Sequence, residues 1–298
     1  MKTRIITGLT GAAGAILALV RLDSPLLGIL LIPFAAMACH EICSVAKVKN
    51  KAMLWFGTAV AALVPPWVEY RDRLPAFLQI PSLALVAFCF AALCLLALLH
   101  SDETRFEHVL FTLFASIAVP AALASLLAVR DLLRRSEGGA FRINLAVYFL
   151  FFIFCCAWLT DTFAYFVGGK LGKHKLSPKI SPKKTVEGAI GGVLCTLLAN
   201  IGFALLFNAV FLKGEYHLNV PALVLLSLPL CLISMLGDLT FSLIKRNFGE
   251  KDFGKFFPGH GGAMDRFDSL VFVAPCCALL LQMNSQLQWD LFYTRILA

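Results

Sequence analysis

The chain has 298 residues, of which 59% are hydrophobic and only 15% are charged. Its mean hydropathy of +0.82 argues against a water-soluble globular protein and for one that crosses a membrane several times. The formal net charge of +8 is concentrated between the apolar runs. We therefore attribute it to membrane orientation and to phosphate-bearing partners, and we expect no nucleic-acid partner.

Nine apolar runs are long enough to cross, or nearly cross, a bilayer. In chain order they are about 5–20, 25–45, 52–68, 80–99, 107–129, 144–167, 187–212, 220–243 and 269–285. We interpret the first as a span or signal anchor, because no convincing cleavage site follows it. Strand-type alternation of useful length is absent from the sequence. The prediction is therefore an all-α, polytopic integral membrane bundle of about nine transmembrane helices.

Loop charges predict the orientation of these spans. With the N-terminus inside, the inner segments also include 46–51, 100–106, 168–186 and 244–268, and together they carry most of the 26 Lys and Arg residues. The loop 130–142 disagrees, because it places four arginines on the predicted outer side. The overall bias nevertheless favours an inner face that carries the two most polar segments.

The ten cysteines all lie in apolar runs and form no CxxC pair, so we expect reduced thiols that face helices or lipid. Cys39 and Cys43 flank His40 and Glu41 at a spacing that would suit a metal. A helix end at the membrane surface is the favoured interpretation. We therefore interpret Glu41 as a structural or lipid-facing residue.

The first polar segment that suggests chemistry begins at Asp161, which interrupts an apolar run. A charge at membrane depth is costly and is rarely retained without a use. Farther on, Ser181 and Pro182 are typical of a helix N-cap and first helical residue. A helix starting there, with Lys183 and Lys184 beside it, would offer phosphate its free N–H groups and the positive end of its dipole.

The second polar segment, residues 234–268, begins in the end of an apolar run that carries Asp238, and it also contains Asp265 and Asp268. Mg²⁺ prefers oxygen ligands from one or two acids together with substrate phosphates, which Asp238 and Asp265 could supply. Asp238, Ser242 and Lys245 are spaced to share one face of a helix, and Asp265 and Asp268 are spaced to share another.

Basic residues and glycines complete this second segment. Lys245, Arg246 and Lys251 can neutralise phosphate oxygens. The turn Pro258 to Gly262 surrounds His260 with glycines that let backbone N–H groups approach an anion closely. The segment is thus suited to handling phosphate groups.

Both segments resemble the phosphatidate cytidylyltransferases (CDP-diacylglycerol synthases), a family of integral membrane enzymes. Residues 242–268 read S-L-I-K-R-x4-K-D-x-G-x2-F-P-x-H-G-G-x2-D-R-F-D and fill nearly every fixed position of the family signature. Ala263 departs from it, where the family usually has a larger aliphatic residue. Residues 158–188 are similar to a second family pattern, in which Phe163 replaces a residue that is often glycine.

The resemblance implies transfer of CMP from CTP to phosphatidic acid, giving CDP-diacylglycerol and pyrophosphate for phospholipid synthesis. We hypothesise that Asp238 and Asp265 bind Mg²⁺, with a second cation such as K⁺ as a further cofactor. The catalytic candidates are Asp238, Asp265, Lys245 and Arg266. The substrate-binding candidates are Ser181, Lys183, Lys184, Thr185, Arg246, Lys251, His260, Asp161 and Asp268.

The expected partners are CTP, phosphatidic acid and the lipid bilayer, and a homodimer is compatible with the sequence. We expect a multi-pass protein of the bacterial inner membrane with its site facing the cytoplasm. The proposed domains are an N-terminal transmembrane bundle, 1–140, and a C-terminal catalytic transmembrane domain, 141–298.

Two other functions stay open. One is a CTP-dependent lipid kinase of the dolichol or phytol kinase type, or an archaeal-type synthase that uses a different lipid phosphate. The other is a transporter, because intramembrane acids and broken helices are also typical of transporters. The clustering of acids with basic loops, and the lack of an internal sequence repeat, favour the cytidylyltransferase.

Overall fold

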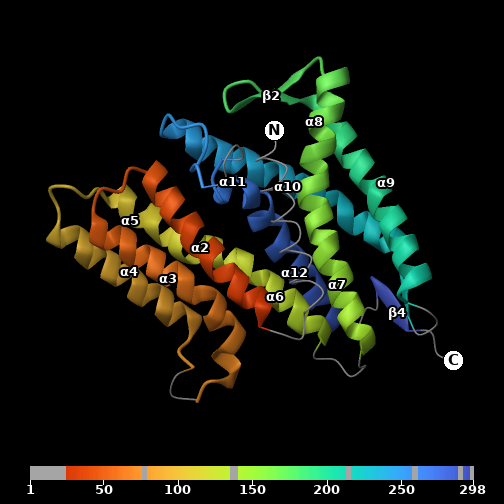
Figure 1. Ribbon diagram of the computed structural model, residues 1–298, viewed down its shortest axis with the longest axis horizontal. Coiled ribbons are helices and arrows are strands. Elements are labelled where there is room, and N and C mark those ends of the chain that lie inside the picture. The colour runs from red at the N-terminus through yellow and green to blue at the C-terminus, as the bar shows by residue number, and fades with distance from the viewer. Residues whose placement is uncertain are drawn as a thin grey trace. The chain divides into compact units, whose positions relative to one another are not determined.

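A computed structural model describes residues 25–75, 79–134, 140–212, 216–256, 261–287 and 291–295. The predicted first span, 5–20, and His260 lie outside these ranges. The described part is mainly helical, with four short strands, which confirms the predicted fold class (Figure 1).

The long helices follow one another along the chain with short connections. They are α2 (Leu26–Val45), α3 (Lys51–Tyr70), α4 (Ser82–Leu99), α5 (Phe106–Leu113), α6 (Val119–Arg134), α7 (Ala140–Phe154), α8 (Thr160–Leu171), α9 (Val186–Val210), α10 (Val220–Asn247) and α12 (Leu270–Gln286). The four-residue helix α11 is Met264–Phe267, and a 3₁₀ turn, Arg71–Arg73, follows α3. Single π-helical turns, Phe114–Ala118 and Cys155–Leu159, join α5 to α6 and α7 to α8.

The strands form two small antiparallel pairs. Strands β1 (Lys175–Ser177) and β2 (Ser181–Thr185) form a hairpin between α8 and α9. Strands β3 (Tyr216–Leu218) and β4 (Tyr293–Arg295) bring the start of α10 next to the end of the chain that the structure describes. The sequence analysis predicted none of these strands, because each is only three to five residues long.

Seven helical segments among the described residues are long and apolar enough to cross a membrane. Helix α12 is also apolar but has only 17 residues. These segments coincide within a few residues with all the predicted runs except the first, which lies outside the described ranges. The chain is therefore a multi-pass membrane protein. One boundary was wrong: α6 continues to Arg134, so Arg130 lies in a helix and is buried beside Asp131, where a loop was expected.

The first of two compact units comprises the described part of Met1–Leu127 together with Ile244–Phe267. Helices α2, α3, α4 and α5 pack against one another within it (Figure 1). The buried side chain of Asn50 starts α3 by accepting a hydrogen bond from the Met53 N–H, and it also donates to the Leu96 carbonyl and to Thr104. One side chain thus caps a helix and fixes the turn after α4.

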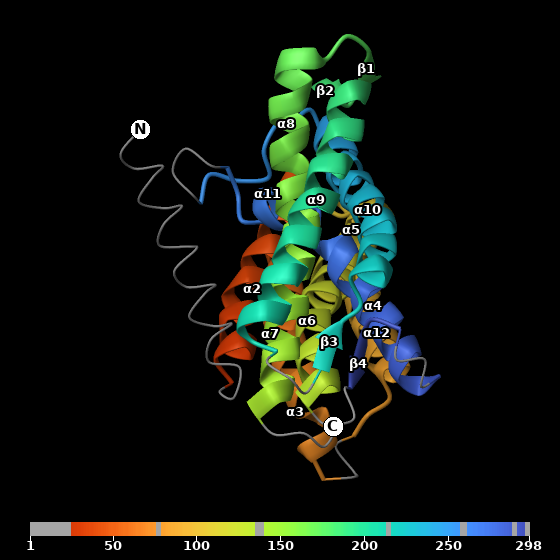
Figure 2. The same ribbon diagram turned by 90° about the vertical axis from the view of Figure 1, so that its right-hand side faces the viewer.

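The second unit comprises Ala128–Leu243 and Asp268–Ala298. Helices α8 and α9 lie side by side, with β1 and β2 at one end of the pair (Figures 1 and 2). A Cβ atom on Gly188 would lie 2.7 Å from the Ala164 carbonyl oxygen, and one on Gly192 would lie 2.7 Å from the Thr160 carbonyl oxygen. The two helices therefore approach closely because small residues line their interface, as is common in membranes.

Buried polar groups also tie the helices of the second unit together. The Thr160 hydroxyl of α8 donates to Thr196 of α9 at 3.3 Å, and the Asn200 amide of α9 donates to Ser227 of α10 at 3.0 Å. The Ser234 hydroxyl of α10 donates to the Ala157 carbonyl at 3.1 Å. Such interhelical hydrogen bonds stabilise helix packing in membranes.

The two units do not follow the sequence-based division at residue 140, since 244–267 packs with the N-terminal helices. The division into an N-terminal transmembrane bundle and a C-terminal catalytic domain stays a prediction. Helix α10 contributes to both units, because Val220–Leu243 belongs to the second and Ile244–Asn247 to the first.

Candidate active site

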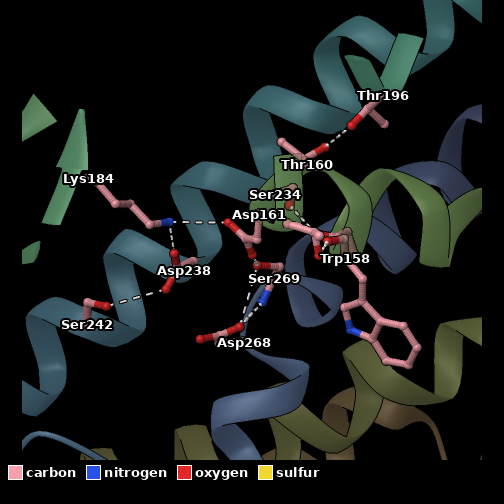
Figure 3. Close-up of polar contacts among 12 residues, drawn as sticks. Trp158, Thr160, Asp161, Lys184, Thr196, Ser234, Asp238, Ser242, Asp268 and Ser269 are labelled. Carbon is pink, nitrogen blue, oxygen red and sulfur yellow. Dashed lines mark hydrogen bonds and ion pairs between the residues drawn. The ribbon is translucent and has the colours of Figure 1, made fainter. Parts of the chain in front are cut away.

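The first candidate cluster lies in the second unit and is centred on Lys184 of strand β2. Its ammonium group is paired with the Asp161 carboxylate of α8 at 3.3 Å and with the Asp238 carboxylate of α10 (Figure 3). The three side chains are 24%, 33% and 17% exposed, so water screens them less than it would a surface pair. Three predicted site residues from distant parts of the chain are thus brought together.

Serines and a further acid surround this cluster. The Ser242 hydroxyl donates to Asp238 at 3.4 Å, so these two residues share a helix face as predicted. The Ser269 hydroxyl donates to Asp161 at 2.9 Å, and the Ser269 N–H donates to the Asp268 carboxylate at 2.7 Å (Figure 3). Asp268 is buried beside the start of α12, and the serines orient the carboxylates that Lys184 neutralises.

The prediction that Ser181 and Pro182 begin a helix was wrong. Ser181 pairs with Ser177 in the hairpin, and α9 begins only at Val186. Thr185 is the actual N-cap, because its hydroxyl accepts a hydrogen bond from the Gly188 N–H at 3.1 Å. Strand pairing keeps the backbone extended through Thr185, which moves the helix start away from Ser181.

Glu187, in the first turn of α9, fastens the hairpin to that helix. Its carboxylate accepts hydrogen bonds from the backbone N–H groups of Lys173 and His174 at 3.0 and 3.1 Å, and it contacts the His174 ring at 2.5 Å. These contacts anchor the start of β1, the strand that pairs with the one carrying Lys184. Lys183 is exposed and Ser181 is half-buried on the same hairpin.

The second candidate cluster lies in the first unit, in the signature segment. The Lys245 ammonium donates to Asp265 Oδ1 at 2.6 Å, while Asp265 Oδ2 accepts the backbone N–H groups of Phe253 and Gly262 at 2.8 and 2.9 Å. The side chains of Lys245 and Asp265 are only 9% and 6% exposed. A buried carboxylate needs such partners to stay charged, and both of its oxygens are satisfied here.

Glu41 of α2 is a member of this second cluster that the sequence analysis did not assign to it. Its carboxylate accepts the backbone N–H groups of Ala263 and Met264, both at 2.9 Å. The residue is only 7% exposed, which agrees with the structural alternative of the sequence analysis and not with the lipid-facing one. The signal that pointed to Asp161, an acid inside an apolar run, was present for Glu41 as well.

The remaining predicted residues of the signature lie at its surface. Arg246 is exposed and donates to the Glu250 carbonyl at 2.8 Å, and Lys251 and Arg266 are also exposed. Gly261 has a φ of +84°, a left-handed conformation that favours glycine. His260 lies outside the described residues.

The donor chemistry of the two clusters is compatible with Mg²⁺. Asp238 and Asp265 each bind a cationic group, the ammonium of Lys184 and of Lys245 respectively. Among the described residues, no three His, Cys, Asp or Glu side chains gather as a complete protein-only metal site. Mg²⁺ does not require one, since one or two carboxylates with substrate phosphates and water suffice.

Comparison with known proteins decides the family. A sequence model described as the cytidylyltransferase family matches residues 2–284. The chain belongs to this family. The match covers nearly the whole chain, and it therefore includes both signature segments and all the candidate residues described above.

Individual relatives support a narrower comparison. Proteins named phosphatidate cytidylyltransferase from Staphylococcus haemolyticus and Staphylococcus epidermidis are 46% and 45% identical over 135 and 133 residues. One from Staphylococcus aureus is 45% identical over 147 residues. These matches cover 45–49% of this chain and 48–51% of the relatives, so the chain matches about half the length of each.

Proposed function

We propose that this protein is a phosphatidate cytidylyltransferase, which transfers CMP from CTP to phosphatidic acid and releases pyrophosphate. The observation that carries the proposal is Lys184 held by the carboxylates of Asp161 and Asp238, in a chain of the cytidylyltransferase family. The arrangement places a partly exposed cation between two acids that lie within the helical segments Asn144–Leu171 and Val220–Asn247. The staphylococcal relatives that bear this name share 45–46% identity with the chain over the matched regions.

The proposed reaction needs little acid–base chemistry. A phosphatidate oxygen, already anionic at neutral pH, forms a bond to the α-phosphorus of CTP. The bond from that phosphorus to the oxygen that bridges to the β-phosphorus breaks, and pyrophosphate leaves. Catalysis therefore depends on positioning the two substrates and on neutralising charge on the phosphates.

The hairpin residues are proposed to bind the nucleotide. Lys183 and Lys184 would neutralise the CTP phosphates, and Ser181 and Thr185 lie on the same strand. Because Lys184 is already fixed by two carboxylates, its ammonium is restrained before substrate arrives. Asp161 would then act by orienting Lys184.

The signature residues are proposed to bind the remaining phosphates, including that of the lipid. Lys245 and Arg266 are the proposed catalytic cations. Arg246, Lys251, His260 and Asp268 are the other proposed substrate-binding residues. Arg246, Lys251 and Arg266 are exposed and so accessible to a substrate phosphate, whereas Lys245 and Asp268 are buried.

Asp238 and Asp265 are the proposed ligands of Mg²⁺, with K⁺ as a candidate second cation. When bound, Mg²⁺ would supply Lewis-acid neutralisation of the nucleotide phosphates. Lys184 and Lys245 pair with the two carboxylates and hold them in place. We place the site on the cytoplasmic face of a bacterial inner membrane, where soluble CTP and a lipid phosphate can both reach it.

Pyrophosphate release by the purified protein in detergent–lipid micelles tests this proposal. We expect release with CTP and Mg²⁺ only when phosphatidic acid is present, and none with EDTA. Formation of CDP upon addition of a lipid alcohol, without pyrophosphate, would instead identify a CTP-dependent lipid kinase. Inactivity in both assays, with folded protein, would contradict both enzymes and favour the transporter.

A further inference from the structure

Three consecutive backbone N–H groups of the signature segment are each bound by a carboxylate. Gly262 donates to Asp265, within the same segment, whereas Ala263 and Met264 donate to Glu41, more than two hundred residues earlier in the chain. The two Glu41 contacts join one carboxylate oxygen to each N–H, both at 2.9 Å. Helix α2 thereby holds the backbone immediately before Asp265.

Two glycines leave the space that the Glu41 carboxylate occupies. A Cβ atom on Gly254 would lie 2.4 Å from Glu41 Oε1, and one on Gly262 would lie 2.4 Å from Glu41 Oε2. Real Cβ atoms do not approach so closely, and the carboxylate is itself buried. The absence of a side chain at Gly254 and at Gly262 therefore leaves room for the Glu41 carboxylate between them.

We propose that Glu41 is a positioning residue that sets the place of Asp265 by fixing the backbone of Ala263 and Met264. Asp265 Oδ1 accepts a hydrogen bond from Lys245, and Oδ2 accepts from the N–H groups of Phe253 and Gly262. The orientation of the Asp265 carboxylate therefore depends on the position of the backbone next to it. A second contact also joins α2 to this segment: the Phe34 ring packs edge-on against the Phe267 ring, with 4.9 Å between the ring centroids.

The chemistry explains why glutamate occupies position 41. Each of the two N–H donors meets its own oxygen of the Glu41 carboxylate, and hydrogen bonds to a carboxylate are stronger than those to a neutral acceptor. Glutamine would keep the size but would point an NH₂ group at an N–H group, leaving one buried donor unpaired. Aspartate would keep the charge but is one methylene shorter.

The functional part of this inference rests on the proposed cytidylyltransferase activity and the Mg²⁺ role of Asp265. Glu41→Gln should raise the Mg²⁺ concentration that gives half-maximal activity by about tenfold, the lower end of the loss typical when an outer partner of a metal ligand is changed. The KM for phosphatidic acid should change much less. A purely structural role would instead lower the active fraction and leave the Mg²⁺ dependence unaltered.

Hydrogen exchange tests the positioning without relying on activity. In the full-length protein in detergent micelles, Glu41→Gln should speed deuterium uptake at the amides of Ala263 and Met264, whereas the matched control Glu103→Gln, at an exposed acid of the same unit, should not. Glu41→Asp should give an intermediate result.

The outcomes separate the two proposals. If exchange is faster in Glu41→Gln but the wild-type protein is inactive, the proposed function is contradicted, whereas the positioning of the Ala263 and Met264 backbone by Glu41 is supported. Unchanged exchange in Glu41→Gln, or an unchanged Mg²⁺ requirement in a variant that is folded and active, would contradict the role of Glu41. If Glu41→Gln did not fold, the same measurements on Glu41→Asp would decide.

Discussion

At the scale of single residues, the protein neutralises acids within an apolar chain by pairing them with lysines or backbone N–H groups. Asp161 and Asp238 share Lys184, and Asp265 is bound by Lys245. Removing one partner from such a group leaves an uncompensated charge, which costs more than the contact itself contributes. This asymmetry makes the lysines sensitive probes of the site.

Replacing Lys184 with methionine should therefore leave Asp161 and Asp238 without their shared cation. We expect kcat to fall by about 100-fold, comparable to the loss of one charge-stabilising donor in an active site. Unfolding temperature should also fall, and the added change Asp161→Asn should restore part of it by removing one unpaired charge. Steady-state kinetics and thermal unfolding in detergent are the measurements.

The control for Lys184→Met is Lys175→Met, which removes an exposed lysine from the other strand of the same hairpin. It should leave both kcat and the unfolding temperature nearly unchanged. Near-normal activity of the Lys184 variant would show that its ammonium is dispensable.

A second residue-scale prediction concerns the space around Glu41. Gly262→Ala should destabilise the protein by about 1–3 kcal/mol, because overpacking forces neighbouring atoms to shift. The cost should be smaller when Glu41 is also alanine, since the added methyl then has room. Gly202→Ala, at a position with open space around its Cβ, is the control. Equal costs of Gly262→Ala in both backgrounds, by thermal unfolding, would rule out the contact.

Single residues also mark the limit of what the sequence predicts. Asp161, Lys184 and Asp238 were found from motifs and from their place in or beside apolar runs, and the structure brings them together. The partner choice was not predictable, because it depends on how distant segments meet. Glu41 was interpreted only as structural or lipid-facing for the same reason, since its partners Ala263 and Met264 are far along the chain.

At the scale of elements, the long helices were predicted well, whereas the short strands were not predicted. An apolar run of membrane length is a local property that predicts a helix without knowledge of its neighbours. The helix start at Ser181 failed because the hairpin partner of that residue, Ser177, competes for its backbone. At Ser181, strand pairing outweighs the local preference for a helix N-cap, and Thr185 is the N-cap residue instead.

The N-cap of α9 provides an element-scale test. Thr185→Val keeps the shape but removes the hydroxyl that accepts the Gly188 N–H, so the protein should lose about 1 kcal/mol of stability. Thr185→Ser should retain most of it. Chemical or thermal unfolding distinguishes these outcomes, and equal stability of the valine and serine variants would argue against Thr185 as the cap.

At the scale of the whole molecule, membrane embedding explains features that would be unfavourable in water. Helix α4 exposes large apolar side chains, among them Leu83, Phe88, Leu98 and Leu99. Exposed apolar surface of this extent indicates contact with lipid. The polar hairpin and signature segments break this pattern, which is why we place the substrates there.

Orientation is testable at this scale. Lys179→Cys introduces an exposed thiol in the hairpin turn, which we predict to be cytoplasmic because of its lysines. In intact cells an impermeant maleimide should label it only after the membrane is opened. The unsubstituted protein is the control for its ten native cysteines, which are buried or half-buried. Labelling of intact cells above this control would reverse the assignment.

The central claim is that the chain joins a nucleotide to a lipid phosphate, and one measurement tests it most directly. Purified protein in micelles is given CTP and Mg²⁺, with or without phosphatidic acid, and pyrophosphate and CDP-diacylglycerol are quantified together. We predict equal amounts of both products, only with phosphatidic acid, and neither with EDTA. Pyrophosphate that forms without phosphatidic acid, or no lipid product from folded protein, would contradict the account.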